Sequence, residues 1–194
     1  MRSLEWDTPP EWVERVERDL PALLSDHAHC ELKAAATVQS LVAKNTEERE
    51  LVEQLAAMAV EELEHFQRVT GELYARGATL RPQEPSPYAE ALRSRSAATR
   101  SSLLLDRLLL AQLIETRSLE RFQLLAEHLT DRPLAALYRD LMASEAGHRA
   151  LFGRLARGLF PAPVVERRQA ELWALEGEIL SSLPFAYRVH SGLQ

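Results

Sequence analysis

The sequence predicts an all-α protein, a four-helix bundle with a crossover connection and extra short helices. Three observations predict it. The chain of 194 residues is rich in leucine, alanine, glutamate and arginine and has only 7 glycines, a composition that favours helices. Long segments show apolar residues at helical spacing. Two expected turns lie midway between pairs of glutamates, as antiparallel helices joined by short turns would place them.

Turn and capping residues mark the expected elements in order. Asn45 and Glu48 could form a capping box, and Asp131 is a candidate N-cap. The proline-rich segment 81–87 is the longest break and the natural crossover between two hairpins. We expect a short helix from residue 9 or 10 to about 20, long helices at about 21–44, 45–77, 99–129 and 131–158, a short helix at 87–95, a last helix after 160–163 that ends near 182, and an irregular end at 184–194.

Composition predicts a single domain over residues 1–194. Cys30 is the only cysteine, so no disulfide framework and no cysteine-based zinc or iron–sulfur site is expected. This fits a cytoplasmic protein. Residues 1–7 have no apolar signal core. The most apolar stretch, 103–114, contains Asp106 and Arg107 and is too short to span a bilayer, so we expect no membrane partner.

A duplicated motif carries the functional argument. Glu31 is followed by a Glu-x-x-His at Glu62 and His65, 31 residues after Glu31. The second copy pairs a single glutamate with another Glu-x-x-His 30 residues later, at Glu115, Glu145 and His148. One Glu from each of two helices, with Glu-x-x-His from each of the other two, builds a two-metal carboxylate site in a four-helix bundle.

The spacing of the motif has a geometric reason. A glutamate and a histidine three residues apart lie on one face of a helix. The midpoint of 31 and 62 falls between Thr46 and Glu47, and the midpoint of 115 and 145 is Thr130; both lie in expected turns. Antiparallel helices therefore bring each single glutamate level with its partner, roughly 23 Å from the turn at 1.5 Å per residue.

The four carboxylates interrupt apolar stripes, so we expect them to be buried. Burying unpaired carboxylates is costly, and two divalent metals would neutralise all four. Neighbouring polar residues are weaker candidates. His27 lies four residues before Glu31 on the same face, whereas His29 points elsewhere. Glu61, Glu64 and His128 are expected on the surface.

The chain resembles the tRNA 2-methylthio-N6-isopentenyladenosine hydroxylases, which are ferritin-like non-haem di-iron monooxygenases. The resemblance rests on the segments 26–35, 61–66, 114–122, 144–148 and 188–192. It implies a ferritin-like fold and hydroxylation of the isopentenyl group of a hypermodified adenosine next to the tRNA anticodon. It also implies two iron ions, dioxygen as co-substrate, and two electrons from a reductase or ferredoxin-type partner.

The resemblance further implies roles for the ligands. Glu62 and Glu145 would bridge the irons, and Glu31 and Glu115 would be terminal carboxylates. His65 and His148 would each bind one iron. The oligomeric state stays open, with a monomer favoured.

The prediction that the protein binds RNA rests on the resemblance more than on the charge of the chain. The formal net charge is −6, which argues against strong non-specific RNA binding. Nearly all positive charge is arginine, which suits phosphate contacts and base stacking. Arg93, Arg95 and Arg100, after the crossover, are our first candidates for contacts with the anticodon loop. A second group comprises Arg149, Arg154, Arg157, Arg167 and Arg168.

Two other classes of function remain open. The protein could be another ferritin-like di-metal protein, such as an iron-oxidising storage protein, a peroxidase or a manganese catalase. A rubrerythrin is disfavoured because the sequence has no Cys-x-x-Cys module. A metal-free helical interaction module is disfavoured by the carboxylates expected in the interior.

Overall fold

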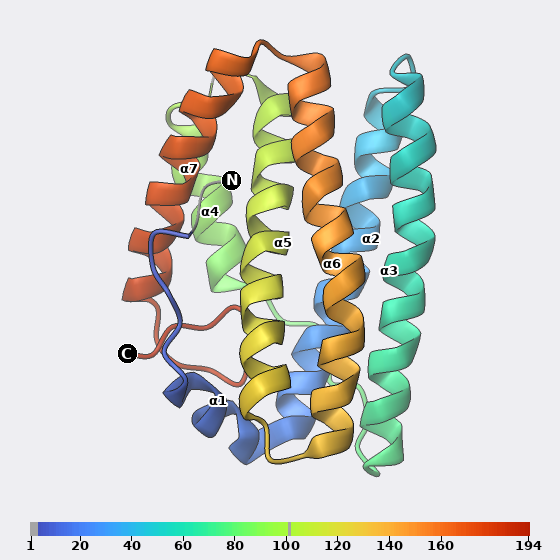
Figure 1. Cartoon of the computed structure of the whole chain (residues 1–194), viewed down its shortest axis with the longest axis vertical. Coiled ribbons are helices and arrows are strands. Elements are labelled where there is room, and N and C mark those ends of the chain that lie inside the picture. The colour runs from blue at the N-terminus through green and yellow to red at the C-terminus, as the bar shows by residue number, and fades with distance from the viewer. Residues whose placement is uncertain (1–3, 101) are drawn as a thin grey trace. The chain divides into compact units, whose positions relative to one another are not determined.

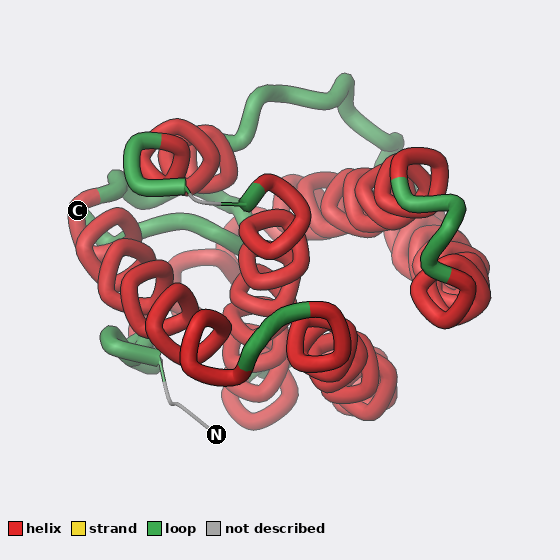
Figure 2. Tube along the Cα trace, turned by 90° about the horizontal axis from the view of Figure 1, so that it is seen from above, coloured by secondary structure: helices red, strands yellow, loops and turns green. Residues whose placement is uncertain are grey.

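A computed structural model describes residues 4–100 and 102–194, and in these ranges the chain consists of helices and irregular segments (Figure 2). The all-α prediction is confirmed. No helix in this part of the chain combines the length and apolar character needed to cross a bilayer. The elements are α1 (Glu11–Val16), the 3-10 helix η1 (Glu17–Asp19), α2 (Leu20–Lys44), α3 (Arg49–Ala75), α4 (Pro87–Ala97), α5 (Leu103–His128), α6 (Arg132–Leu159) and α7 (Ala162–Ser182).

The four long helices that the sequence predicts form two antiparallel hairpins, α2 with α3 and α5 with α6 (Figure 1). The first turn covers residues 45–48, so its centre lies between Thr46 and Glu47. The second turn covers residues 129–131 and is centred on Thr130. Both turns lie where the glutamate spacing predicts them.

The described chain divides into two compact units. Unit 1 comprises the described residues up to Arg15, Glu84–Ala186 and His190–Gln194. It is built on the α5–α6 hairpin, and α7 packs on α4, α5 and α6. Unit 2 comprises Val16–Gln83 and Tyr187–Val189 and is built on the α2–α3 hairpin. The single domain over 1–194 stays a prediction.

The predicted capping box at the start of α3 is wrong. The Asn45 side chain donates instead to the carbonyl oxygen of Leu41, at 2.7 Å, and Asn45 caps the end of α2. Helix α3 therefore begins at Arg49, with no side-chain cap from Glu48. The other predicted cap is correct, because Asp131 accepts a hydrogen bond from the backbone N–H of Leu134 at 3.0 Å.

Helix α5 begins later than predicted. Its N-cap is Ser102, whose hydroxyl accepts from the Leu105 N–H at 3.3 Å. Thr99, the predicted start, lies in the preceding loop, where its hydroxyl accepts from Arg168 at 2.8 Å. Ser101, which falls inside the predicted helix, lies outside the described residues. Residues 1–3 also lie outside them, and the expectation about a signal segment partly rests on these residues.

The C-terminal segment is irregular, as predicted, but side chains hold it in place. In unit 1, Trp12 Nε1 donates to the hydroxyl of Ser191 at 3.1 Å, and Arg121 donates to the Ser191 carbonyl oxygen at 2.8 Å. In unit 2, the Val189 N–H donates to the Asp26 carboxylate at 2.9 Å. Val189 and Ser191, two positions apart, are thus anchored in different units.

A substitution at Gly192 would test how tightly the C-terminal segment packs. A Cβ at this position would collide with the backbone carbonyl of Leu183, and backbone atoms cannot easily move aside. We expect Gly192→Ala to lower the free energy of unfolding by roughly 1–3 kcal/mol, the usual cost of overpacking. Urea unfolding of the purified variant measures the change.

Gly71 is the matched control. It lies inside α3, and a Cβ there meets nothing within 4 Å. Gly71→Ala should therefore stabilise the protein by roughly 0.5–1 kcal/mol, because alanine favours a helix interior over glycine. A Gly192→Ala variant as stable as Gly71→Ala would contradict the tight packing of the segment.

Asp26 should make stability depend on pH. Burial raises the pKa of Asp26 above its ordinary 3.8, and this outweighs the Val189 N–H and the charges of Arg188, Lys33 and His27, which lower it. A raised pKa in the folded state contributes stability below about pH 3.8 that is lost as pH rises through the folded pKa. Asp26→Asn keeps an acceptor for Val189 without the charge.

We therefore expect the stability difference between Asp26→Asn and wild type to shift in favour of the variant as pH rises from 4 to 7. Urea unfolding of the metal-free proteins at several pH values measures this difference. A difference that stays constant over this range would show that the carboxylate titrates alike in the folded and unfolded chains.

Candidate metal centre

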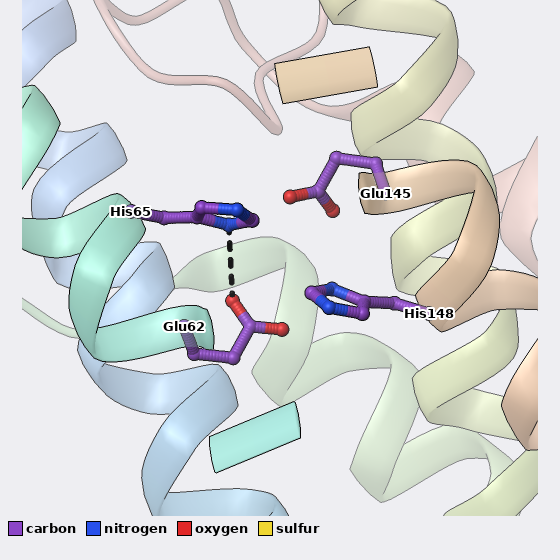
Figure 3. Close-up of side chains that lie close together, drawn as sticks. All are labelled: Glu62, His65, Glu145 and His148. Atoms are coloured by element: carbon purple, nitrogen blue, oxygen red, sulfur yellow. Dashed lines mark ion pairs between the residues drawn. The ribbon is translucent and has the colours of Figure 1, made fainter. Parts of the chain in front are cut away.

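In unit 2, α2 and α3 bring a single glutamate to a Glu-x-x-His pair. Glu31 lies on α2, and Glu62 and His65 project from one face of α3 (Figure 3). His65 Nδ1 lies 3.8 Å from Oε2 of Glu31 and 3.8 Å from Oε2 of Glu62. All three side chains are buried. Two buried carboxylates thus lie at equal distances from one imidazole nitrogen. Their negative charges, removed from water, would attract a cation.

Glu31 has a second close partner in His27, one helical turn earlier on α2. His27 Nε2 lies 2.6 Å from Oε1 of Glu31, and the His27 side chain is fully buried. Burial by itself would raise the pKa of Glu31. The interaction with His27, with smaller contributions from His65 and Glu62, outweighs burial and lowers the pKa of Glu31 below its ordinary value. Glu31 is therefore held as a carboxylate.

In unit 1, α5 and α6 supply the second copy of the motif. Glu115 lies on α5, and Glu145 and His148 project from one face of α6 (Figure 3). Their exposed fractions are 6%, 2% and 4%, respectively, so all three are buried as their positions in apolar stripes predict. The i and i+3 spacing turns the carboxylate and the imidazole of α6 to the same side of the helix.

The donor set fits a metal ion. Glu62, His65, Glu145 and His148 are buried, and each offers one ligand atom that could hold a metal. Carboxylate oxygens and imidazole nitrogens together suit divalent ions such as iron and manganese. A cation would also compensate carboxylates that have been removed from water.

The neighbouring polar residues behave as the sequence suggests. His29 turns away from the ligands, and its Nε2 lies 2.8 Å from the Arg81 carbonyl oxygen, a contact that fixes the crossover segment to α2. Glu61, Glu64 and His128 are exposed.

Sequence reasoning missed a buried polar cluster in unit 1. Arg117 donates to both carboxylate oxygens of Glu176 on α7, at 2.8 Å each, and Tyr88 donates to the same carboxylate at 3.1 Å. Burial and the charge of Glu176 raise the pKa of Tyr88 well above 10.0, so it keeps its proton. The ion pair joins residues 59 positions apart, and no local pattern pairs them.

The three arginines proposed for RNA are on the surface. Arg93 and Arg95 are exposed on α4, and Arg100 is exposed in the loop that follows. Arg95 also makes a 2.6 Å ion pair with Glu178, and both side chains are largely exposed. Such a surface pair is weak and would not prevent Arg95 from turning to a phosphate.

The sequence analysis placed Arg168 in the second group of candidates for RNA contacts, and the structure corrects this. Arg168 is buried and donates to both carboxylate oxygens of Asp106, at 2.8 and 2.7 Å. It also donates to the Ser96 carbonyl oxygen at the end of α4, at 2.8 Å. Arg168 therefore holds helices together and is not available to a phosphate.

Comparisons with known proteins point to one family. The family model described as tRNA-(MS[2]IO[6]A)-hydroxylase (MiaE) matches residues 1–191. A tRNA 2-(methylsulfanyl)-N(6)-isopentenyladenosine(37) hydroxylase of Pseudomonas putida is 37% identical over 186 residues, which cover 96% of this chain and 90% of that protein. The protein of the same description from Salmonella typhimurium is 27% identical over 242 residues, covering 100% of this chain and 89% of that protein.

A solved structure is similar over nearly the whole chain. It is described as protein 43 with aldehyde deformylating oxygenase activity from Synechococcus, and it matches with a TM-score of 0.92 and 37% identity. The match covers 99% of this chain and 97% of that one, which confirms the predicted fold class. The family match over residues 1–191, together with the 37% identical Pseudomonas putida protein, shows that this chain belongs to the tRNA-(MS[2]IO[6]A)-hydroxylase family.

Proposed function

We propose that this protein is a tRNA-modifying non-haem di-iron monooxygenase. Its substrate would be 2-methylthio-N6-isopentenyladenosine next to the anticodon, and its product the same nucleoside with a hydroxyl on the isopentenyl group. The observation that carries the proposal is the family match over residues 1–191 of a chain that buries both copies of the Glu-x-x-His motif. The names of the relatives from Pseudomonas putida and Salmonella typhimurium support the substrate.

The proposal assigns one set of ligands from each unit. Glu31, Glu62 and His65 come from unit 2, and Glu115, Glu145 and His148 come from unit 1. Glu62 and Glu145 would bridge two irons, with Glu31 and Glu115 terminal and one histidine on each iron.

Two irons bound by this set would supply oxidation by dioxygen, in which one oxygen atom enters a C–H bond and the other leaves as water. The balance requires two electrons and two protons, for which we expect a reductase or ferredoxin-type partner. The protein's own residues hold the ligands in fixed positions and exclude water by burial. The small side chains of Ala34, Ala35 and Ala111 on the ligand helices would leave room for a prenyl tail.

A second candidate keeps the metal centre but changes the substrate. The similar solved protein carries aldehyde deformylating oxygenase activity at 37% identity. Another di-metal oxidase of the same fold is therefore the alternative, and the test must include the nucleoside itself.

The decisive experiment supplies iron-loaded protein with dioxygen, a reductant and tRNA that contains the methylthio-isopentenyl nucleoside. We expect mass spectrometry of the digested tRNA to show that this nucleoside gains one oxygen atom. The double variant Glu62→Ala/Glu145→Ala should lose both bound iron and product, because it lacks the carboxylates proposed to bridge the metals, while circular dichroism still shows a helical protein.

The matched control is Glu61→Ala/Glu64→Ala, which removes two exposed carboxylates from the same turn of α3. It should keep two irons and full activity. Full iron occupancy in the Glu62/Glu145 variant would contradict the ligand assignment. Loaded wild type that leaves the nucleoside unchanged but converts an aldehyde would favour the alternative.

The exposed arginines of α4 and its following loop are the proposed tRNA surface. Replacing Arg93, Arg95 and Arg100 with alanine should weaken tRNA binding and flatten its dependence on salt. Each lost phosphate contact lowers the salt slope by roughly one. Binding isotherms at several salt concentrations measure both effects, and the iron content should stay the same.

A second triple variant, which removes the same three positive charges elsewhere on the protein, controls for the effect of net charge on tRNA binding. Arg49, Arg68 and Arg132 are exposed on α3 and α6, and their replacement by alanine should affect tRNA binding less. Equal losses in the two triple variants would mean that only net charge matters. If replacing Arg93, Arg95 and Arg100 instead leaves tRNA binding at the wild-type level at every salt concentration, the next candidates are the exposed members of the second group, Arg154, Arg157 and Arg167.

A further inference from the structure

The two oxygens of the Glu31 carboxylate face different partners. Oε1 lies 2.6 Å from His27 Nε2, whereas Oε2 lies 3.8 Å from His65 Nδ1 on the neighbouring helix. The contact is buried and close, so the imidazole ring of His27 covers one oxygen of the carboxylate. One oxygen of Glu31 is therefore already occupied by the protein.

The backbone around His27 is fixed from two directions. On one side, the Ser25 hydroxyl accepts from the Arg81 N–H at 2.9 Å. On the other side, Asp26 accepts from the Val189 N–H at 2.9 Å. The crossover and the C-terminal segment thus hold the backbone of this turn of α2, from which His27 projects.

The second copy of the motif has no histidine at the corresponding position. The position four residues before Glu115 on α5 is Ala111, which is 8% exposed. A methyl group has no proton to donate, so residue 111 cannot occupy an oxygen of Glu115 as His27 occupies one of Glu31. The two copies of the motif thus have the same ligand types, but the residue one helical turn before the single glutamate is histidine in one copy and alanine in the other.

We propose that His27 is a positioning residue that restricts Glu31 to a single metal-binding oxygen, Oε2. The inference rests on the proposed di-iron centre and deepens it. The two metals would then have unlike surroundings, because a histidine lies one turn before Glu31 and an alanine lies one turn before Glu115. Partners of this kind orient a ligand, and their loss typically weakens metal binding by roughly 10- to 100-fold.

The test compares His27→Ala, His27→Gln and wild type, each loaded anaerobically with 57Fe(II). In wild type we expect two distinct quadrupole doublets in the Mössbauer spectrum. In His27→Ala one doublet should change while the other stays, and Fe(II) titration should show one of two sites weakened by roughly 10- to 100-fold. His27→Gln should restore the wild-type spectrum, because a glutamine amide can donate across one helical turn.

His29→Ala is the matched control. It removes a second buried histidine from the same turn of α2, one that contacts Arg81 and not Glu31. Its two doublets and both Fe(II) affinities should match wild type. A general loosening of α2 would instead change the spectrum of both histidine-to-alanine variants.

Several results would overturn the inference. It fails by itself if wild type binds two irons and hydroxylates tRNA while His27→Ala shows unchanged doublets and affinities, or while His29→Ala changes the spectrum equally. Wild type that binds no iron overturns both this inference and the proposed function. If His27→Ala does not fold, an iron-loaded crystal structure of wild type decides: Glu31 bound through Oε2 alone supports the inference, and Glu31 bound through both oxygens overturns it.

Discussion

Both helical hairpins bury carboxylates, and the cost of removing negative charge from water is the constraint on which the rest of the structure depends. A buried carboxylate must meet positive charge or hydrogen-bond donors. In unit 2, Glu31 meets this need through His27 and through His65, which lies equally close to Glu62. Two divalent cations would neutralise the four glutamates of the proposed centre. The same side chains that would be costly in an empty interior are the ligands that such cations prefer.

Unit 1 also buries carboxylates that are not ligands, and it compensates them differently. Glu176 meets Arg117, and Asp106 meets Arg168, each through two hydrogen bonds to a guanidinium. Hydrogen bonds from Glu176 overcome the effect of burial and raise the pKa of Arg117, so this pair stays charged. A guanidinium offers donors but no ligand atom, so these pairs fix helices in place. The glutamate and histidine sets keep oxygen and nitrogen atoms that a metal can bind.

The fold does not determine the reaction by itself. The chain is 37% identical to the tRNA-modifying hydroxylase of Pseudomonas putida, and it is also 37% identical to a solved protein described by aldehyde deformylating oxygenase activity. The substrate must therefore depend on side chains around the ligands and on the surface that meets it. The histidine at position 27 and the alanine at position 111 illustrate how a duplicated ligand set can hold two unlike metal positions. The exposed arginines of α4 are the proposed contact surface for a large anionic substrate.

The sequence by itself determined the helices, both hairpin turns and the burial of the six candidate ligands. These depend on local rules: helical periodicity, turn residues and the distance of each glutamate from a turn. The start of α3 was misjudged because asparagine can cap either end of a helix, and Asn45 caps the end of α2 instead. Only the tertiary structure decided that Arg117 pairs with Glu176, that Arg168 is buried against Asp106, and that the C-terminal segment is anchored at Asp26. Such pairings join distant parts of the chain, and their energies depend on which helices pack together, which periodicity along one helix does not specify.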